Sequence, residues 1–317
     1  MKFFVTGGAG FVGSHIVDRL LTRGSVTVYD NLSLGTLDNL AHHHDAQEEG
    51  RLTFVEGDVL DRKALGKAMA DHDVVFHLAA NSDISQNDKT DIDLNQGILA
   101  TYNVLEEMRL AGIKRIVFTS SSVIFGEQEG AVFSEDHGPC LPISFYGASK
   151  LAAEGLITAF CHNFGLRCWI YRFANIVGSR GTHGALVDFI KKLKKDPRSL
   201  EVLGDGKQSK PYLEVNDCAD GMLFGFDNAS DEVNVFNLAN TDAVCVTDMA
   251  NAIVTALGLK DVEIRYTGAD RGWRGDVPKV RMTNEKMATL GWTPVRNSEQ
   301  AVEKAAADLA AESAGRG

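Results

Sequence analysis

The sequence lacks a basic excess, a long apolar run and any closely spaced pair of cysteines. Its Lys and Arg residues number 32 against 43 Asp and Glu, which gives a formal net charge of −11. Nucleic-acid-binding proteins usually carry a basic face, so we expect no nucleic-acid partner. No apolar stretch approaches the ~18 residues of a membrane-spanning helix, so we expect no membrane partner either.

The cysteines and the first residues of the chain favour a cytoplasmic protein. The five cysteines form no Cys-x-x-Cys pair, and their odd number is typical of free thiols in a reducing compartment. Met1 to Thr6 contain neither a basic segment nor a small-residue cleavage site, so we expect no signal peptide. We also expect no bound metal. The run His42–His44 resembles a metal-binding tract, but its polar, acidic surroundings favour a solvated loop.

Short β-rich runs alternate with helical patterns through the first half of the chain. We expect strands over 2–6, 25–29, 52–56, 74–78, 116–120 and 167–171, and helices over 14–23, 62–70, 98–111 and 147–164. This alternation is typical of a parallel sheet with helices on both faces. We therefore predict an α/β fold with a doubly wound, Rossmann-like sheet.

After Asn175 the pattern loosens, and glycine-rich turns interrupt it. We expect helices over 183–193, 217–226, 246–257 and 298–312, and a short strand over 200–203. We interpret this half as a smaller C-terminal lobe that closes over a cleft and binds a substrate.

A glycine-rich turn follows the first expected strand and opens the first expected helix. Gly8, Gly10 and Gly13 match G-x-G-x-x-G, and Gly7 with the last two matches the variant with one more spacer. Glycines here allow a tight turn and a close approach of a pyrophosphate to backbone amides. A glycine turn without a ligand is the alternative, which the strand–turn–helix context disfavours. We expect dinucleotide contacts from Gly7, Gly10, Phe11, Val12 and Gly13.

The ends of the next three strands carry residues that suit a dinucleotide. Asp30 ends the second strand, where its carboxylate would accept hydrogen bonds from an adenosine ribose and repel a 2′-phosphate, which favours NAD over NADP. Asp58 and Val59 follow the third strand and would meet the adenine, although Asp58 or Asp61 could also cap the next helix. The fourth strand ends in small side chains that let the backbone approach the cofactor, in the segment Leu78, Ala79 and Ala80.

A pair of residues further along predicts the chemistry. Tyr146 and Lys150 are spaced i, i+4, which puts a phenol and an ammonium on one face of a helix. A tyrosine with its usual pKa near ~10 is a poor base, but a nearby ammonium and a positive nicotinamide lower that pKa. Lys150 can also hold the nicotinamide ribose. The strand end Thr119–Ser122 offers a hydroxyl to the reacting oxygen, with an ordinary polar turn as the alternative.

Together these residues resemble the extended short-chain dehydrogenase/reductase superfamily, and within it the UDP-glucose (UDP-galactose) 4-epimerases of the NAD-dependent epimerase/dehydratase family. The similarity runs from Lys2 to about Leu309, through residues 5–11, 29–33, 145–150, 172–175, 204–206 and 271–277. It implies a homodimeric isomerase that uses NAD to epimerise C4 of a UDP-hexose through a transient 4-keto intermediate. It implies a Rossmann domain for NAD (residues 1–174 and about 212–240) and a UDP-sugar-binding lobe (175–211 and about 241–317).

The resemblance also implies roles for single residues. Counting back five residues from Gly126, the family's catalytic Ser or Thr falls on Ser121, which joins Tyr146 and Lys150 in the implied catalytic set. The implied cofactor-binding residues, besides those above, are Asn31, Ser33, Tyr146, Lys150 and Phe173. The implied substrate-binding residues are Ser121, Ser122, Tyr146, Asn175, Gly184, Ala185, Glu201, Leu203, Lys210 and Arg271, with Arg274 as the alternative to Arg271.

The chain departs from the family at three positions and leaves other reactions open. Gly97 stands where the family has an asparagine, Phe125 where a tyrosine is common, and Val280 where larger epimerases have a tyrosine. 4-Epimerisation of UDP-glucuronate or of a UDP-N-acetylhexosamine is an alternative that uses the same residues. Another dehydratase or reductase is less consistent, because the Asp-Glu pair of the dehydratases falls on Ser122 and Val123. A non-catalytic NAD-binding protein tends to lose the tyrosine or lysine, and this chain keeps both.

Overall fold

The computed structural model describes residues 1–81, 90–269 and 277–315. The chain divides into two units with their own internal contacts. The first comprises Met1–Gly126, Cys140–Arg172 and Met222–Phe236, and the second comprises Glu127–Pro139, Phe173–Gly221 and Asn237–Gly317. The assignment of NAD to one part of the chain and of a UDP-sugar to another stays a prediction.

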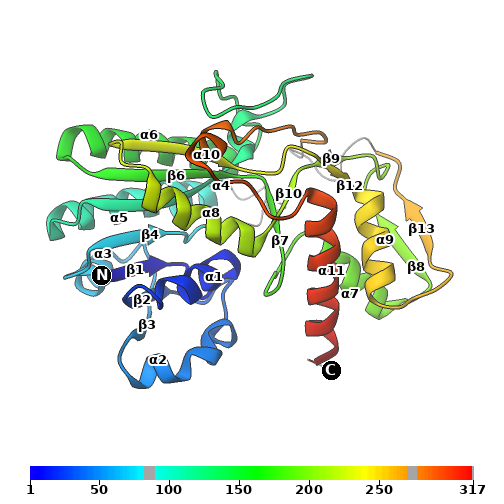
Figure 1. Ribbon diagram of the computed structural model, residues 1–317, viewed down its shortest axis with the longest axis horizontal. Coiled ribbons are helices and arrows are strands. Elements are labelled where there is room, and N and C mark those ends of the chain that lie inside the picture. The colour runs from blue at the N-terminus through cyan, green and yellow to red at the C-terminus, as the bar shows by residue number, and fades with distance from the viewer. Residues whose placement is uncertain (82–89, 270–276, 316–317) are drawn as a thin grey trace. The chain divides into compact units, whose positions relative to one another are not determined.

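Apolar runs form the central strands of the first unit. β1 (Lys2–Thr6) and β4 (Val74–His77) are buried along almost their whole length, as expected for strands that helices cover on both faces. The strand order is β11-β6-β5-β4-β1-β2-β3 (Figure 1). The other strands are β2 (Ser25–Asp30), β3 (Leu52–Glu56), β5 (Arg115–Ser121), β6 (Arg167–Phe173) and β11 (Val233–Leu238).

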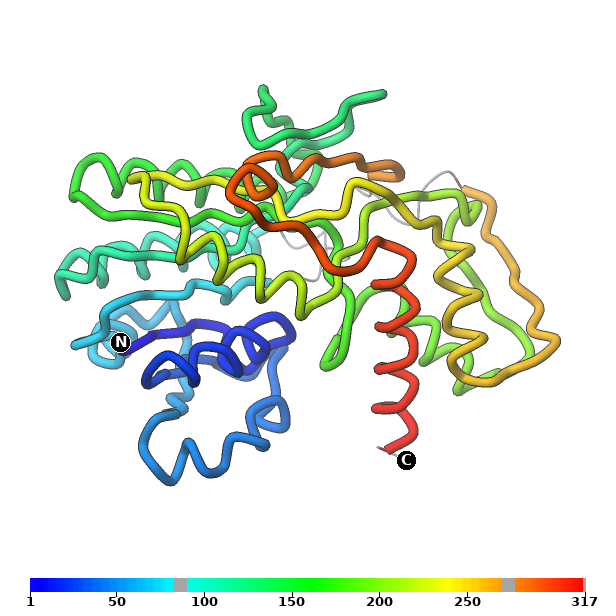
Figure 2. The backbone as a smooth tube through the Cα atoms, in the orientation of Figure 1, coloured from blue at the N-terminus to red at the C-terminus, as the bar shows by residue number. Residues whose placement is uncertain are grey.

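The strand order reverses at β1. This strand pairs in parallel with β2, where Phe3 faces Val26, and with β4, where Phe3 faces Val74. The chain runs from β3, at one edge, through α3 (Arg62–Met69) to β4 on the other side of β1 (Figure 2). Ligands of open parallel sheets bind at such a reversal, at the carboxyl ends of the strands. The predicted doubly wound, Rossmann-like α/β fold is confirmed.

The two faces of the sheet receive different helices because side chains alternate along each strand. Phe4 of β1 and Val75 of β4 belong to one core with α3, α5 (Ala100–Ala111) and α6 (Phe145–Phe164). Phe76 points to the other face, where its ring centre lies 5.8 Å from that of Phe226 in α8 (Val215–Asn228). Helices therefore bury both faces, as the apolar strands require (Figure 1).

The first helix begins and ends three residues earlier than expected. α1 spans Phe11–Leu20, because Gly10 already has the extended backbone of an N-cap and its carbonyl accepts the Ser14 N–H at 3.0 Å. The glycine turn thus passes directly into the helix. The other expected helices and strands of this half match the structure with small shifts at their ends.

Two segments are helical beyond what the sequence indicated. The expected solvated loop at His42–His44 is wrong, because the chain forms the 3₁₀ helix η1 (Leu37–His43) and then α2 (His44–Glu48). Thr36 caps η1, since its hydroxyl accepts the Asp38 N–H at 3.3 Å. The helix expected over 98–111 is preceded without a break by α4 (Thr90–Asp93) and the π-helical segment η2 (Leu94–Leu99).

The second unit has its own core. Phe189 of α7 (Ala185–Lys195), Leu200 of β8 (Ser199–Val202) and Val302 of α11 (Ser298–Gly315) pack in one cluster with α9 (Val246–Ala256). Short strands pair as β8 with β13 (Glu263–Tyr266), β7 (Asn175–Val177) with β10 (Tyr212–Glu214), and β9 (Ser209–Lys210) with β12 (Val244–Cys245), and α10 spans Glu285–Leu290. Among the described residues of both units, no helix combines the length and the apolarity that crossing a membrane takes.

Candidate active site

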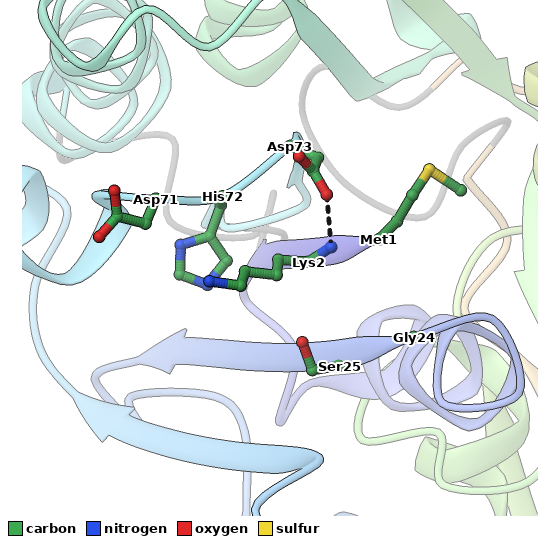
Figure 3. A pocket seen from close by; sticks show the side chains of 7 residues that line it. All are labelled: Met1, Lys2, Gly24, Ser25, Asp71, His72 and Asp73. Carbon is green, nitrogen blue, oxygen red and sulfur yellow. Dashed lines mark hydrogen bonds between the residues drawn. The ribbon is translucent and has the colours of Figure 1, made fainter.

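The candidate site lies in the first unit, at the carboxyl ends of β1, β2, β4 and β5. Because these strands are parallel, the residues that follow them share one edge of the sheet. The surface hollow in Figure 3 lies at the opposite edge, where Lys2 begins β1, Ser25 begins β2 and Asp73 precedes β4. Within the hollow, the Lys2 N–H donates to Asp73 Oδ2 at 2.7 Å. Because the hollow lies where the strands begin, it is separate from the predicted site, which lies where they end.

The glycine-rich turn between β1 and α1 has no room for side chains. Gly7 has a φ of +71°, and a Cβ there would lie 2.7 Å from the backbone nitrogen of Ala79, just after β4. A Cβ on Gly13 would overlap the Gly7 carbonyl oxygen, which accepts the Gly10 N–H at 3.2 Å. Gly10 caps α1 without a side chain, so an anion can approach the first turn, which Phe11 and Val12 begin. The turn fits a dinucleotide pyrophosphate.

Asp30 is fixed beside this turn. Its side chain is buried, with Oδ2 accepting the Ala9 N–H at 3.0 Å and Oδ1 accepting the Leu32 N–H at 2.9 Å. Burial raises the pKa of Asp30, and the hydrogen bonds from Leu32 and Ala9 lower it. Each carboxylate oxygen has two lone pairs, so each can also accept a ribose hydroxyl. The carboxylate therefore fits the adenosine ribose of NAD.

The residues predicted to meet the adenosine are connected to one another. Asn31 Nδ2 donates to Asp58 Oδ2 at 3.2 Å, and the Ser33 N–H donates to Asn31 Oδ1 at 3.1 Å. Val59 is buried next to Asp58. Of the two candidate caps of α3, Asp61 is the one whose carboxylate accepts a helix N–H at 3.1 Å, that of Ala64.

Tyr146 and Lys150 lie one turn apart on α6. Ser144 caps this helix, because its hydroxyl accepts the Gly147 N–H at 3.0 Å. The Lys150 ammonium is buried, donates to the Thr119 carbonyl oxygen of β5 at 2.7 Å, and lies 5.7 Å from the centre of the Tyr146 ring. The ammonium is thus held between the end of β5 and the phenol.

Burial and two nearby carboxylates shift the pKa values of Tyr146 and Lys150. Burial lowers the pKa of Lys150 to about 8, against the raising effects of Glu154 and Asp93. The pKa of Tyr146 is raised, first by burial and then by the Asp93 carboxylate. A cationic group bound beside the phenol would lower the pKa of Tyr146 again. The arrangement therefore favours a protonated phenol until such a group is present.

The serines at the end of β5 have different surroundings. Ser120 is buried and its hydroxyl donates to Glu154 Oε1 at 2.5 Å, while Arg172 Nη2 donates to Glu154 Oε2 at 2.8 Å. Ser121 is the next residue, so its side chain points to the other side of the strand, where it caps η3 (Ser122–Phe125). The Ser120 hydroxyl is therefore engaged by the buried Glu154–Arg172 ion pair. Ser121 and Ser122 are both partly exposed at the strand end.

Sequence reasoning did not identify Glu154 and Asp93. Glu154 lies four residues after Lys150 on α6, so the helical period alone places it on the same face. That signal was present in the sequence. Asp93 acts on Tyr146 and Lys150 from α4, which packs against α6, and no spacing in the sequence indicates this contact.

Gly97, at the position of the family's asparagine, lies in η2 against α6. A Cβ on Gly97 would lie 2.5 Å from the Ser149 hydroxyl oxygen and 2.6 Å from the Ser149 Cβ. That hydroxyl donates to the Tyr146 carbonyl oxygen at 2.8 Å. The glycine therefore lets η2 approach the helix turn that carries Tyr146 and Lys150.

A chain of buried hydrogen bonds connects the glycine turn with η2 through His77. The Ala79 N–H donates to the Thr6 hydroxyl at 3.3 Å, and this hydroxyl lies 2.7 Å from His77 Nδ1. His77 Nε2 lies 3.2 Å from the Thr101 hydroxyl, which donates to the Gly97 carbonyl oxygen at 2.6 Å. Because each hydroxyl has one proton, Thr6 donates to Nδ1 and Nε2–H donates to Thr101. The chain thus requires neutral His77 with its proton on Nε2.

The residues predicted to bind a UDP-sugar lie mostly in the second unit, at strand ends and at a helix start. Gly184, with a φ of +97°, and Ala185 form the start of α7. Lys192 of α7 donates to the Glu201 carbonyl oxygen of β8 at 3.0 Å. Of the other predicted substrate residues in this unit, Asn175 begins β7, Leu203 follows β8 and Lys210 lies in β9. Phe173, a predicted cofactor residue, ends β6. Arg271 and its alternative Arg274 lie outside the described residues.

Comparison with known proteins places the chain in a family. The model of a family described as "NAD dependent epimerase/dehydratase family" matches residues 3–239. The chain is 31% identical over 310 residues to a putative UDP-glucose 4-epimerase of Methanocaldococcus jannaschii, covering 95% of each chain. A crystal structure of a UDP-galactose 4-epimerase has a TM-score of 0.87 at 37% identity, covering 98% of this chain and 99% of that one. A UDP-N-acetylglucosamine 4-epimerase from Methanobrevibacter ruminantium has a TM-score of 0.85 at 26% identity and covers 98% of each chain.

Replacing His77 should destabilise the first unit. His77→Phe keeps a ring of similar size but leaves the buried hydroxyls of Thr6 and Thr101 without this partner. An unsatisfied buried group costs about 1–3 kcal/mol, so the free energy of unfolding should fall by about 2–4 kcal/mol at pH 7. Chemical denaturation measures this fall. A double-mutant cycle with Thr101→Val should be non-additive, and additive losses would contradict the hydrogen-bond chain.

His77→Phe should also remove a pH dependence of the free energy of unfolding. Burial, followed by the Lys150 charge, lowers the pKa of His77 from 6.5 to about 3, so below about pH 6.5 the unfolded chain binds a proton that the folded protein does not. The stability contributed by neutral His77 is present above pH 6.5 and is lost as the pH falls. The difference in unfolding free energy between the native protein and His77→Phe should therefore shrink by about 2 kcal/mol from pH 7 to pH 5.

Proposed function

Because the chain belongs to the NAD-dependent epimerase/dehydratase family, we propose that it interconverts the C4 epimers UDP-glucose and UDP-galactose through a transient 4-keto intermediate. The observation that carries the proposal is the phenol of Tyr146 beside the buried ammonium of Lys150, next to the hydroxyl-bearing end of β5. Likeness to 4-epimerases over nearly the whole chain supports it.

The first unit would hold NAD, which when bound supplies the hydride acceptor and donor at the sugar carbon. Gly7 and Gly13 allow the tight packing of the turn, and Gly10 caps α1 without a side chain, so the amides of the first turn would be open to the pyrophosphate. Asp30 would hold the adenosine ribose with Asn31 and Ser33. The remaining cofactor contacts that we propose are those of Phe11, Val12, Asp58, Val59, Leu78, Ala79, Ala80, Tyr146, Lys150 and Phe173.

Tyr146 would move the proton. Its phenolate oxygen would take the proton of the sugar 4-hydroxyl and later return it to the 4-oxygen. Lys150 would stabilise the phenolate, because its ammonium is fixed to the Thr119 carbonyl, and would also bind the nicotinamide ribose. The Ser121 hydroxyl would hydrogen-bond the same sugar oxygen and keep it in reach of Tyr146. Glu154 would keep Lys150 charged, since it raises the pKa of that ammonium.

The nucleotide and sugar would be held largely by the second unit. A helix start such as that of α7, at Gly184 and Ala185, suits the charge of a diphosphate. Lys210 and Arg271 would add positive charge there, and Asn175 would contact the UDP moiety. Glu201 and Leu203 would flank the uracil, largely through their backbone, and Ser122 would join Ser121 at the sugar.

A UDP-N-acetylhexosamine is the second candidate substrate. Val280 is smaller than the tyrosine that narrows the sugar pocket in larger epimerases, and the similarity to a UDP-N-acetylglucosamine 4-epimerase supports this range. UDP-glucuronate is a further alternative, supported by the similarity to a solved structure of MoeE5 in complex with UDP-glucuronic acid and NAD. A dehydratase is disfavoured by Ser122 and Val123, which supply neither the acid nor the base for the loss of water.

We also propose a cytoplasmic homodimer. Its support is the exposed apolar surface on α5 and α6, where Tyr102, Leu110 and Phe164 are 38%, 60% and 43% exposed. Several exposed apolar side chains on two neighbouring helices would suit a contact with a second copy of the chain. The five cysteines are free thiols, which suits a reducing compartment.

Incubation with UDP-sugars tests the function. The purified protein should convert UDP-galactose to UDP-glucose without added cofactor, and NAD should appear in the supernatant when the protein is denatured. Chromatographic separation of the epimers and a dinucleotide assay measure both. Formation of a dehydrated product, or release of NADP in place of NAD, would argue against the proposal.

Substitutions test the roles of single residues. Tyr146→Phe should lower kcat at least ~10²-fold, because general base catalysis typically contributes that much. Lys150→Ala should be comparably damaging and should also weaken NAD binding. Ser121→Ala should lower kcat far more than Ser122→Ala, which serves as the matched control. If Ser122→Ala is the more damaging change, the sugar hydroxyl contact belongs to Ser122.

Val280 tests the substrate range. The native protein should turn over UDP-N-acetylgalactosamine as well as UDP-galactose, because valine leaves room for an acetamido group. Val280→Tyr should lower kcat/KM for the acetylated sugar relative to UDP-galactose. Side-by-side kinetics of both proteins measure the ratio, and an unchanged ratio would exclude Val280 as a gate.

A further inference from the structure

Three side chains outside the candidate active site converge on the surface of the first unit. His42 Nε2 lies 2.9 Å from Asp18 Oδ1, and His43 Nε2 lies 2.7 Å from the same oxygen. The two imidazole centres are 4.0 Å apart. Asp18 belongs to α1. His42 and His43 are the last two residues of η1, directly before α2.

The backbone at this junction explains the convergence. Neighbouring residues of a 3₁₀ helix point about 120° apart, so consecutive side chains do not normally meet one atom. His43 leaves the helical conformation, with φ −97° and ψ 28°, as η1 passes into α2. Its ring therefore turns beside that of His42, towards the carboxylate.

We propose that Asp18, His42 and His43 form a binding site for a divalent transition-metal cation such as Zn²⁺. Neutral imidazole nitrogens and a carboxylate oxygen are ligands that such cations prefer. Ligand atoms about 2.1 Å from a tetrahedral Zn²⁺ ion lie about 3.4 Å apart. The two separations, 2.9 and 2.7 Å, are hydrogen-bond distances, and all three atoms lie within 4.8 Å of one another. An ion would replace the protons of these hydrogen bonds, and each N···O pair would widen by about 0.5–0.7 Å to take it.

The ligands are accessible to a cation and are held in place. The side chains of His42, His43 and Asp18 are 46%, 18% and 23% exposed, so an ion can enter from solvent. η1 is fixed to the glycine turn, because Asn39 Nδ2 donates to the Ala9 carbonyl oxygen at 2.9 Å. Anchored ligands lose little freedom when an ion binds.

A second group on the same segment provides the contrast. His44 lies 3.9 Å from Asp45 and 3.6 Å from Glu48, and these side chains are 70%, 94% and 70% exposed. Their atoms are farther apart and almost fully solvated. The ligand atoms of this second group also lie within 4.8 Å of one another, so solvation and spacing distinguish the two groups. His44 is therefore a matched control that shares the sequence run but lies in an almost fully solvated group.

Calorimetric titration with Zn²⁺ tests the site. The full chain is prepared without an affinity tag, stripped with a chelator and titrated at pH 7.5. One ion per chain should bind. His43→Gln and Asp18→Asn should each weaken the binding at least ~10-fold, as losing a ligand or its support typically does. His44→Gln should bind Zn²⁺ as the native protein does.

Thermal unfolding gives a second measurement. Zn²⁺ should raise the Tm of the native protein and of His44→Gln but not that of His43→Gln, because an ion that binds only the folded site stabilises it. In the absence of Zn²⁺, His44→Gln should unfold like the native protein, since its side chain is 70% exposed. Each protein is compared with itself with and without Zn²⁺, so the loss of the His43–Asp18 contact does not enter the Tm shift. No saturable binding, or binding lost with His44→Gln and kept with His43→Gln, would overturn the proposal.

Discussion

The buried ammonium of Lys150 is the constraint on which the candidate active site depends. A lysine charge taken out of water is costly unless it is paired and hydrogen-bonded. Here the Thr119 carbonyl oxygen accepts a hydrogen bond from the Lys150 ammonium, and the Glu154 carboxylate lies one turn further along α6. Glu154 is in turn fixed by Ser120 and Arg172. Satisfying one charge therefore sets the position of α6 on β5, and with it the distance between the phenol of Tyr146 and the serines.

A chain of satisfied buried hydrogen bonds also connects the glycine-rich turn with η2. The His77 chain runs from the Ala79 amide, beside Gly7, to the Gly97 carbonyl in η2. The Ala79 N–H donates, the Gly97 carbonyl accepts, and the side chains of Thr6, His77 and Thr101 between them each donate and accept, so none is left unsatisfied. A π-helical segment widens the helix locally and is often found at functional sites. In this protein η2 brings the backbone at Gly97 against the turn that carries the two chemical residues.

The strands, helices and motifs could be predicted because each depends on residues that are close together in the sequence. Apolar runs between glycine turns predicted β1 to β6, and the spacing of Tyr146 and Lys150 needed only the helical period. What it did not contain depends on distant partners. Asp93 and His77 act on residues far along the chain, and short strands such as β9 and β12 exist only as pairs. At His42–His44 the polar composition misled, since the helix there is fixed by the Thr36 cap and by Asn39.

The close contact of Gly97 and Ser149 has an evolutionary consequence. An asparagine at 97 would collide with the Cβ of Ser149, which cannot rotate away as a hydroxyl could. The two positions are therefore coupled: a side chain at 97 fits only if position 149 becomes glycine or η2 moves away from α6. A substitution of Gly97 therefore needs a second change, at position 149 or in the placement of η2, before it can be accommodated.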